Sequence, residues 1–404
     1  MSIRWSGANS GCTERTATRV PTIPRPTSFL SGGKTASNQW FLLTTSLTLM
    51  PPSALRNKPR SSRPSSCPEA PRKLLQGAPK MIFLTEDDVN DLVSMDDALT
   101  AVRTALGGQG RGTTNNAIRS RASLGPLNLN ILGGAVDEMQ SLGAKIYVTG
   151  SGAAKFWFML FASDGTCDAL MEADRLGQLR TGAASGISTQ SLARADADEL
   201  GLIGSGYQAW TQAEAIVRSS NISKIRVFSR SPQNAQKFAT DFSERFSLSV
   251  EPVTSVDSAI DGADIVVTMT SSHNPIIEAS HLRPGTHYVF AGSNNPLNSE
   301  AAPAVLSGID VLVTDDLDQA RIEGGTLLRA VDAGTIGWET VGLLGDVIAG
   351  RAIGREGDNQ TTAFIAHGAG SWDTALGRVA FEKATAQGRG VVLPISGGVV
   401  AGRR

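Results

Sequence analysis

Residues 200–209 read Leu-Gly-Leu-Ile-Gly-Ser-Gly-Tyr-Gln-Ala, an apolar run that breaks into a glycine loop and then enters a helical pattern. Gly204 permits a tight turn, Gly206 lets the backbone approach a pyrophosphate, and the positive end of the next helix faces its charge. Ala209 replaces the third glycine of the usual fingerprint, at a position that needs only close packing of helix and strand. The loop therefore predicts a dinucleotide site. Its expected cofactor contacts are Gly204, Ser205, Gly206, Tyr207 and Gln208.

The residues after this loop alternate between helical and strand-like patterns. Expected strands are 224–228, 248–250, 263–268, 287–291 and 311–314, and expected helices are 207–219, 232–246 and 255–259. Strands that alternate with helices indicate an α/β fold with a doubly wound parallel sheet of the Rossmann type. The alternative is a flavodoxin-like layer that binds no dinucleotide.

The end of the second strand bears on which dinucleotide binds. NAD-preferring sheets usually place an acidic residue there to bond the ribose hydroxyls. This chain has Ser229-Arg230-Ser231 instead, and a guanidinium with small hydroxyls suits a 2′-phosphate that a carboxylate would repel. We therefore predict NADP(H) as the preferred cofactor and NAD(H) as the second choice, although Arg230 could also stack on adenine or face solvent. Thr268 and Thr270 are further expected cofactor contacts.

Composition and charge exclude several classes of protein. The 404 residues, 41% of them hydrophobic, are enough for two domains with separate cores. A formal net charge of −1 provides no general field for nucleic acid or an anionic membrane. Three scattered cysteines without a CxxC pair indicate neither a disulfide framework nor a metal site. No apolar stretch reaches the length of a membrane span, and we expect a cytoplasmic protein.

Residues 1–80 differ from the rest of the chain. They are rich in Ser, Thr, Pro and Arg, and their only acids are Glu14 and Glu69. Such a segment buries too little apolar surface to offset chain entropy, so we expect a disordered extension. Its basic, acid-poor composition also fits a mitochondrial transit peptide. The abrupt start of ordered-looking sequence at Met81 fits a mis-assigned start as well.

From Met81 onward the pattern is that of a folded domain. Ser94 is the expected N-cap of a helix over 98–106, which Gly107-Gly108 would end. Asp164-Gly165 predicts a hairpin turn inside an antiparallel, strand-rich block. The expected strands of that block are 127–131, 144–149, 155–161 and 167–171, and later helices are expected over 338–348 and 371–386.

The simplest domain organisation is a Rossmann domain inserted into a second, α+β domain built from both ends of the folded chain. That second domain would carry the substrate site and the dimer interface. The expected bounds are 81–196 for its first part, 197–320 for the Rossmann domain, 321–390 for its return helices and 391–404 for a flexible tail.

Basic side chains in the first part are candidates for binding an anion. Lys145 begins an apolar strand, where it would lose water, unless it reaches the surface as most lysines do. Arg119 and Arg121 precede a strand and could fork onto a carboxylate. Arg180 and Thr181 precede a helix of small residues, where they would form an anion site or a structural salt bridge.

Residues 172–186, Glu-Ala-Asp-Arg-Leu-Gly-Gln-Leu-Arg-Thr-Gly-Ala-Ala-Ser-Gly, followed by the glycine loop, resemble the ornithine cyclodeaminase/μ-crystallin family. Gly143-Ala-Lys145, Gly285-Thr-His287, Glu323-Gly324 and the segment 368–373 also fit, and the resemblance covers about 81–390. It implies a homodimer with a Rossmann domain and a second domain that holds the substrate site. It also implies activity on small amino acids or their imines.

The resemblance assigns roles to several residues. Lys145 matches the active-site lysine, which holds the substrate carboxylate or polarises the reacting carbon. Arg121 matches the arginine that pairs with the carboxylate, and Arg119 is an equally reachable candidate. Arg180 and Thr181 match the block against substrate and cofactor phosphate.

One position departs from the cyclodeaminase pattern. Asn294 stands where cyclodeaminases carry an aspartate after the fifth strand of the sheet. An amide can orient water or donate a hydrogen bond, but it cannot accept a proton at neutral pH. The asparagine therefore favours a ketimine reductase over ornithine cyclodeaminase, with a non-catalytic NADPH-binding protein as a third reading, although Asn294 could also only shape its loop. His367 is interpreted as a core or surface histidine rather than a catalytic one.

Overall fold

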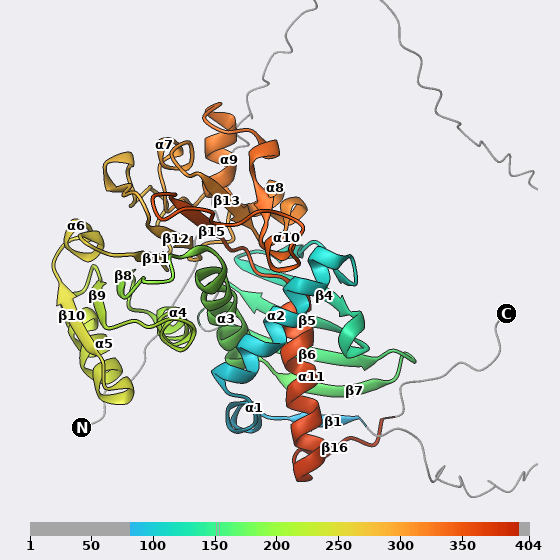
Figure 1. Cartoon of the computed structure of the whole chain (residues 1–404). Coiled ribbons are helices and arrows are strands. Elements are labelled where there is room, and N and C mark those ends of the chain that lie inside the picture. Colours follow the sequence, from blue (N-terminus) through green and yellow to red (C-terminus); the bar gives the residue numbers. More distant parts are fainter. Residues whose placement is uncertain (1–80, 151, 153, 396–404) are drawn as a thin grey trace, which may run out of the picture. The chain divides into compact units, whose positions relative to one another are not determined.

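The computed structural model describes residues 81–150, 152 and 154–395 (Figure 1). The predicted N-terminal extension over 1–80 lies outside the described residues, as does most of the predicted tail. The described chain forms two sheets, each with helices packed against it, and chain segments from both ends meet in the first sheet.

The first sheet is mostly antiparallel and has the order β16-β1-β7-β6-β5-β4-β2, with β3 paired to β4. Its strands are β1 (Ile82–Leu84), β2 (Thr114–Asn116), β3 (Ser120–Leu124), β4 (Leu127–Val136), β5 (Ser141–Thr149), β6 (Lys155–Ala162), β7 (Cys167–Glu172) and β16 (Val391–Val392). The predicted hairpin between β6 and β7 is confirmed, since Gly165 has a φ of 85° and Asp164 Oδ1 accepts from Thr166 N at 2.9 Å. β16 pairs with β1, so the tail predicted to be flexible from 391 begins with a strand.

Strand β5 turns alternate side chains to opposite faces of this sheet. Gly143, Lys145 and Tyr147 face the side that α11 (Gly370–Gln387) covers. Leu142 and Val148 lie on the other face and are exposed. Alternate residues of β5 therefore lie in the interior of the molecule and on its surface.

Helix α2 (Met95–Arg111) differs from the prediction at its C-terminal end. Ser94 forms the predicted cap, but the helix runs through Gly107-Gly108 and ends only at Gly112, which has a φ of 81°. A Cβ on Gly110 would lie 2.1 Å from the carbonyl oxygen of Gly345, at α10 (Leu344–Ile348). Late glycines in this helix therefore permit close helix packing rather than ending the helix.

Helix α3 (Asp174–Leu192) begins six residues before Arg180, so Arg180 and Thr181 lie inside the helix and not at its N-terminus. Its first turn is capped from a distance, because the Glu86 carboxylate accepts from the backbone N–H of Asp174 and of Arg175. Glu172 in turn accepts from Glu86 N at 2.8 Å, at the start of α1 (Glu86–Leu92). These reciprocal caps fix where α3 starts.

The second sheet is parallel throughout and has the order β10-β9-β8-β11-β12-β15-β13-β14, which confirms the doubly wound fold. Its strands are β8 (Glu199–Ile203), β9 (Lys224–Phe228), β10 (Ser249–Val253), β11 (Ile265–Thr268), β12 (His287–Phe290), β13 (Val311–Thr314), β14 (Gly342–Leu343) and β15 (Thr362–Ile365). The connecting helices are α4 (Tyr207–Ser219), α5 (Pro232–Phe246), α6 (Val256–Ile260), α7 (Pro303–Leu306), α8 (Leu317–Glu323) and α9 (Gly325–Asp332).

The segment 321–390, expected to contain only return helices, contributes strands to this parallel sheet. β15 lies between β12 and β13 and is fully buried. The helix predicted over 338–348 is instead a 3-10 turn (Trp338–Thr340), the strand β14 and the short α10. Four residues, only three of them apolar, are too few to show a strand in the sequence, and only the neighbouring strands make β15 recognisable. α11 alone matches the expected return helix.

Candidate active site

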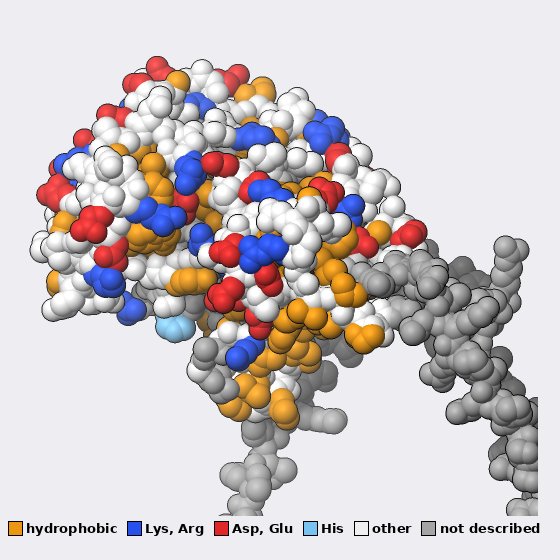
Figure 2. Space-filling model, turned by 90° about the horizontal axis from the view of Figure 1, so that it is seen from below, with side chains coloured by type: hydrophobic (Ala, Val, Ile, Leu, Met, Phe, Trp, Pro, Cys, Tyr) orange, Lys and Arg blue, Asp and Glu red, His pale blue; other side chains and the backbone are white. Residues whose placement is uncertain are grey.

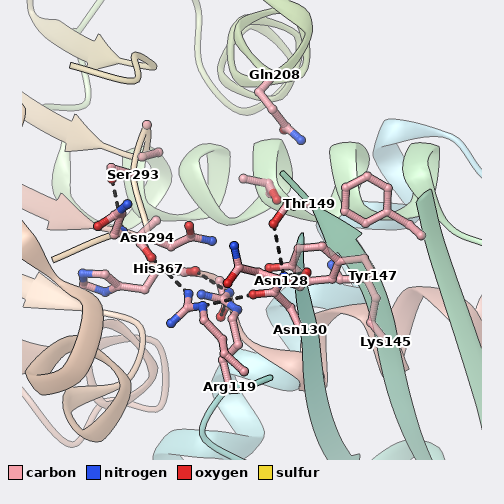
Figure 3. Close-up of a pocket in the computed structure, with 18 of the residues that line it drawn as sticks. Arg119, Asn128, Asn130, Lys145, Tyr147, Thr149, Gln208, Ser293, Asn294 and His367 are labelled. Carbon is pink, nitrogen blue, oxygen red and sulfur yellow. Dashed lines mark hydrogen bonds between the residues drawn. The ribbon is translucent and has the colours of Figure 1, made fainter. Parts of the chain in front are cut away.

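A cavity of about 630 Å³ opens between the carboxyl ends of the parallel strands and the inner face of the first sheet. Figure 3 shows its walls, with polar side chains from both sheets pointing toward one another. Six of the predicted site residues line it together: Arg121, Lys145, Arg180, Thr181, Gln208 and Asn294.

Lys145 reaches the cavity from the middle of β5, not from its start, and its side chain is only 2% exposed. Its Nζ donates to Asp373 Oδ1 on α11 at 2.8 Å. Burial, followed by the positive charge of Arg180, lowers the pKa of Lys145 to about 7. The desolvation expected from the sequence is thus present, and this amine can hold or release a proton near neutral pH.

Arg180 shares the same carboxylate oxygen. Its Nε donates to Asp373 Oδ1 at 3.2 Å, and its guanidinium lies 5.6 Å from the centre of the Trp372 ring. Asp373 itself is fully buried. Two cations from different elements are therefore held together by one anion at the wall of the cavity.

Arg119 and Arg121 form a second group of this kind around Glu323, the last residue of α8. Each arginine pairs with a different oxygen of the buried Glu323 carboxylate. Arg119 is enclosed and also donates to the carbonyl of His367 at 2.9 Å. The Arg121 side chain is 32% exposed, so of the two it is the one that a ligand can reach.

Arg121 also links the two sheets. Its Nε donates to Asn130 Oδ1 at 3.0 Å, and its NH2 group donates to the backbone carbonyl of Asn294 at 3.1 Å. The side chain of Asn294 is left at the exposed mouth of the cavity. This asparagine therefore has a structural contact through its backbone, and within the described part of the chain its side-chain amide beside the cavity makes no hydrogen bond.

The glycine loop fits a dinucleotide pyrophosphate. Gly204 has a φ of 115°, and a Cβ there would lie 2.4 Å from the carbonyl oxygen of Met269. A Cβ on Gly206 would meet nothing within 4 Å, so the start of α4 is open to a ligand. Gln208 points into the cavity (Figure 3), and its Oε1 has no hydrogen-bond partner among the described residues.

Other predicted cofactor contacts lie away from the cavity. Ser205, Gly206 and Tyr207 border a neighbouring hollow of about 390 Å³. Ser231 caps α5 by accepting from Asn234 N, and Arg230 is exposed beside it. The structure brings none of the residues 229–231 to the wall of the cavity or of the hollow.

Thr268 and Thr270 stand at the end of β11 but serve the protein's own packing. Thr268 is fully buried, and Thr270 donates through N and Oγ1 to Glu300 Oε1, both at 2.8 Å. Glu300 also accepts from Gly292 N at 2.8 Å, and burial raises its pKa. This carboxylate ties together the two loops that follow β11 and β12 and so shapes the floor of the cavity.

His367 is a buried core histidine, in agreement with its interpretation from the sequence. Its Nδ1 lies 3.1 Å from Asp315 Oδ1, and its side chain is 1% exposed. The ring points away from the other labelled side chains in Figure 3. Its contribution to the cavity is the backbone carbonyl that holds Arg119.

Three carboxylates at the site were not predicted from the sequence: Asp373, Glu323 and Glu300. The segments containing Asp373 and Glu323 were part of the family resemblance, but nothing local marks either as the partner of a distant cation. Among the described residues, no group of three His, Cys, Asp or Glu could hold a metal ion. No helix within 81–395 is long and apolar enough to cross a membrane.

The parallel sheet, its glycine loop and the cationic cavity define a two-domain α/β protein of the Rossmann type. A model of the Ornithine cyclodeaminase/mu-crystallin family matches residues 80–388. The chain therefore belongs to the ornithine cyclodeaminase/μ-crystallin family, as its motifs indicated.

Similar proteins include enzymes of amino-acid and imine chemistry. An alanine dehydrogenase from Archaeoglobus fulgidus is 31% identical over 317 residues, covering 76% of this chain and 97% of that protein. The structure of Thermococcus litoralis Δ1-pyrroline-2-carboxylate reductase with NADH and L-proline has a TM-score of 0.74 at 26% identity, covering 78% of this chain and 100% of that one. The iminosuccinate reductase of Paracoccus denitrificans with NAD⁺ has a TM-score of 0.72 at 27% identity, covering 76% and 98%.

Proposed function

We propose that this protein is an NAD(P)H-dependent reductase of ketimines or cyclic imines of small amino acids, acting in reverse as an amino-acid dehydrogenase. The observation that carries the proposal is the buried Lys145, held with Arg180 in a cavity that also exposes Arg121 and adjoins the glycine loop. Similar proteins named as imine reductases and an alanine dehydrogenase support it.

The cavity's own residues would bind the substrate. Arg121 and Lys145 offer N–H donors to a carboxylate, and the enclosed Glu323 keeps Arg121 oriented toward the cavity. A bound nicotinamide would supply hydride to the imine carbon. Clamping the carboxylate beside the cofactor site would supply much of the acceleration, because it holds the reacting carbon in one place.

Asn294 supports a reductase over a cyclodeaminase. Hydrolytic loss of ammonia needs a group that takes a proton from water, and an asparagine amide cannot do this. The Asn294 side chain stands at the mouth of the cavity, where it would orient water or the substrate nitrogen. Ornithine cyclodeaminase activity is the second candidate, and a binding protein without turnover is the third.

For the cofactor we propose a preference for NADP(H), with NAD(H) as the alternative. Support comes from the exposed Arg230 and the capping Ser231 at the start of α5, where no carboxylate of the first turn would repel a 2′-phosphate. Three similar structures hold NADH or NAD⁺, and the affinities of this chain for NADPH and NADH test the preference.

For the assembly we propose a homodimer formed through the face of the first sheet that no described helix covers. Ile131, Leu142, Val148 and Trp157 lie on this face and are each between 37% and 45% exposed. Figure 2 shows hydrophobic side chains gathered along one side of the molecule, at the lower edge of the view. An apolar sheet face of this kind needs a partner, and the similar alanine dehydrogenase structure is a dimer.

Light scattering tests the proposed dimer. The wild-type protein should have twice the chain mass, and Trp157→Asp should have the mass of the monomer.

The activity is tested by a screen for NADPH and NADH oxidation. Cyclic imines, and 2-oxo acids mixed with ammonia or amines, are the test substrates. Ornithine is the control, because a cyclodeaminase would release ammonia from it without net change in cofactor absorbance. Cofactor oxidation with any imine supports the reductase. Ammonia release from ornithine alone would refute it, and cofactor binding without either reaction would favour the binding protein.

A further inference from the structure

We propose that Asp373 is a positioning residue for the proposed reaction, because its buried carboxylate holds Lys145 and Arg180 at one oxygen and so fixes the amine that exchanges a proton with the substrate nitrogen. The inference rests on the proposed function. Asp373 comes from α11, Lys145 from β5 and Arg180 from α3, so the carboxylate joins three elements at the cavity wall.

The contacts of Asp373 are uneven in a way that matters for this role. Oδ1 accepts from both cations, at 2.8 Å from Lys145 Nζ and 3.2 Å from Arg180 Nε. Oδ2 is buried and has no hydrogen-bond partner among the described residues. A purely structural carboxylate would normally use both oxygens. Among the described residues, the Asp373 carboxylate accepts hydrogen bonds only from Lys145 and Arg180, the two cations of the cavity wall.

The charges around Lys145 determine what Asp373 does to it. Arg180 from α3 and Arg119 from the loop before β3 disfavour its charged form, and so does burial. Asp373 from α11 opposes them, Asp174 from α3 is a more distant anion, and the Tyr147 ring lies 6.0 Å from Nζ. With Asp373 in place the two protonation states are balanced near neutral pH, and without it the amine would be neutral.

A lysine with a pKa of about 7 is suited to both directions of the reaction, because its protonated and neutral forms are both present near neutral pH. Reduction of a neutral imine adds hydride at carbon and a proton at nitrogen. Lys145 gives the proton: the Nζ–H bond breaks, its electron pair stays on Nζ, and an N–H bond forms on the substrate. In the reverse reaction the neutral Lys145 takes that proton back from the substrate nitrogen. The carboxylate and the nitrogen of such a substrate share one carbon, so an amine that contacts the carboxylate is also beside the nitrogen.

The test is the pH dependence of Lys145 acetylation by acetic anhydride, followed by mass spectrometry, in the full-length protein. In Asp373→Asn the midpoint at which Lys145 becomes reactive should fall by roughly 1–3 pH units, since a contacting opposite charge is lost. The alkaline limb of kcat/KM for imine reduction should move with it. Asp168→Asn is the matched control, because Asp168 also anchors α11, through Arg378 at 2.9 Å, but contacts neither Lys145 nor Arg180.

An unchanged acetylation midpoint in folded Asp373→Asn would overturn the proposal. If that variant does not fold, Asp373→Glu decides: it keeps the charge but displaces Lys145, so kcat should fall by roughly 10²-fold at an unchanged midpoint. A wild-type kcat in Asp373→Glu would also overturn it. Acetylation requires no substrate, so a wild-type protein that oxidises no cofactor would refute the proposed function while the midpoints still report on Asp373.

Discussion

The two glycines of the cofactor loop should respond differently to replacement by alanine. The change at Gly204 should mainly lower the stability of the protein, and the change at Gly206 should mainly weaken dinucleotide binding. At Gly204 the φ of 115° disfavours any Cβ, at a cost of roughly 1–3 kcal/mol. The Cβ would also lie 2.4 Å from the Met269 carbonyl oxygen, and relieving such overpacking costs roughly 1–3 kcal/mol more. Gly204→Ala should therefore lower the free energy of unfolding by about 2–6 kcal/mol.

Gly206 is the matched control, because its φ is −81° and a Cβ there would meet nothing within 4 Å. Gly206→Ala should change the free energy of unfolding by less than about 1 kcal/mol, the usual size of an N-cap effect. The methyl group would, however, occupy the space through which a pyrophosphate approaches α4. We expect at least about a tenfold loss of dinucleotide affinity, which is about 1.4 kcal/mol.

Two measurements separate these effects. Guanidinium unfolding, followed by tryptophan fluorescence, gives the free energy of unfolding of wild type and both variants. Titration with NADH and NADPH, followed by nicotinamide fluorescence, gives the dissociation constants. Wild-type affinity in Gly206→Ala would refute the assignment of this loop to the pyrophosphate, and wild-type stability in Gly204→Ala would refute the steric reasoning.

Three further substitutions test the cavity and the cofactor preference. Lys145→Ala should lower kcat of imine reduction by roughly 10²–10⁴-fold in a folded protein, and near-normal turnover would remove Lys145 from the reaction. Arg230→Ala should weaken NADPH binding by roughly 1.5–3 kcal/mol in calorimetry and leave NADH unchanged, whereas similar and unaltered affinities would contradict an NADP(H) preference. Glu323→Gln leaves Arg119 without its buried counter-charge and should lower the free energy of unfolding by roughly 3–5 kcal/mol, so unchanged denaturation would show that the carboxylate is dispensable.

The Rossmann elements could be predicted from the sequence because their signals are local. Helices 207–219 and 232–246 have the predicted bounds, since caps, proline and apolar spacing all lie within a few residues. Glycines in α2 were misinterpreted because a glycine that ends a helix and one that lets a second helix approach look the same in sequence. Only the carbonyl of Gly345, more than 200 residues away, distinguishes them.

The cations of the cavity were also predictable, and their anions were not. Lys145, Arg121 and Arg180 stand in recognisable motifs. Asp373 and Glu323 can be recognised as their partners only in the folded protein, where α11 and α8 bring the carboxylates next to these cations. Burial then makes each pairing obligatory, because a lone charge in such a place would be costly. Sequence motifs thus identified cations that line the cavity but not the carboxylates that hold them.

Strand β5 places Lys145 in the cavity while its neighbours Ala144 and Ile146 belong to the outer face of the sheet. Insertion or deletion of a single residue before Lys145 would exchange the two faces. An aliphatic side chain would then enter the cavity, and an ammonium would enter the apolar surface. This strand can therefore vary by substitution but not in length, and a library of single-residue deletions should find it among the least tolerant segments of the chain.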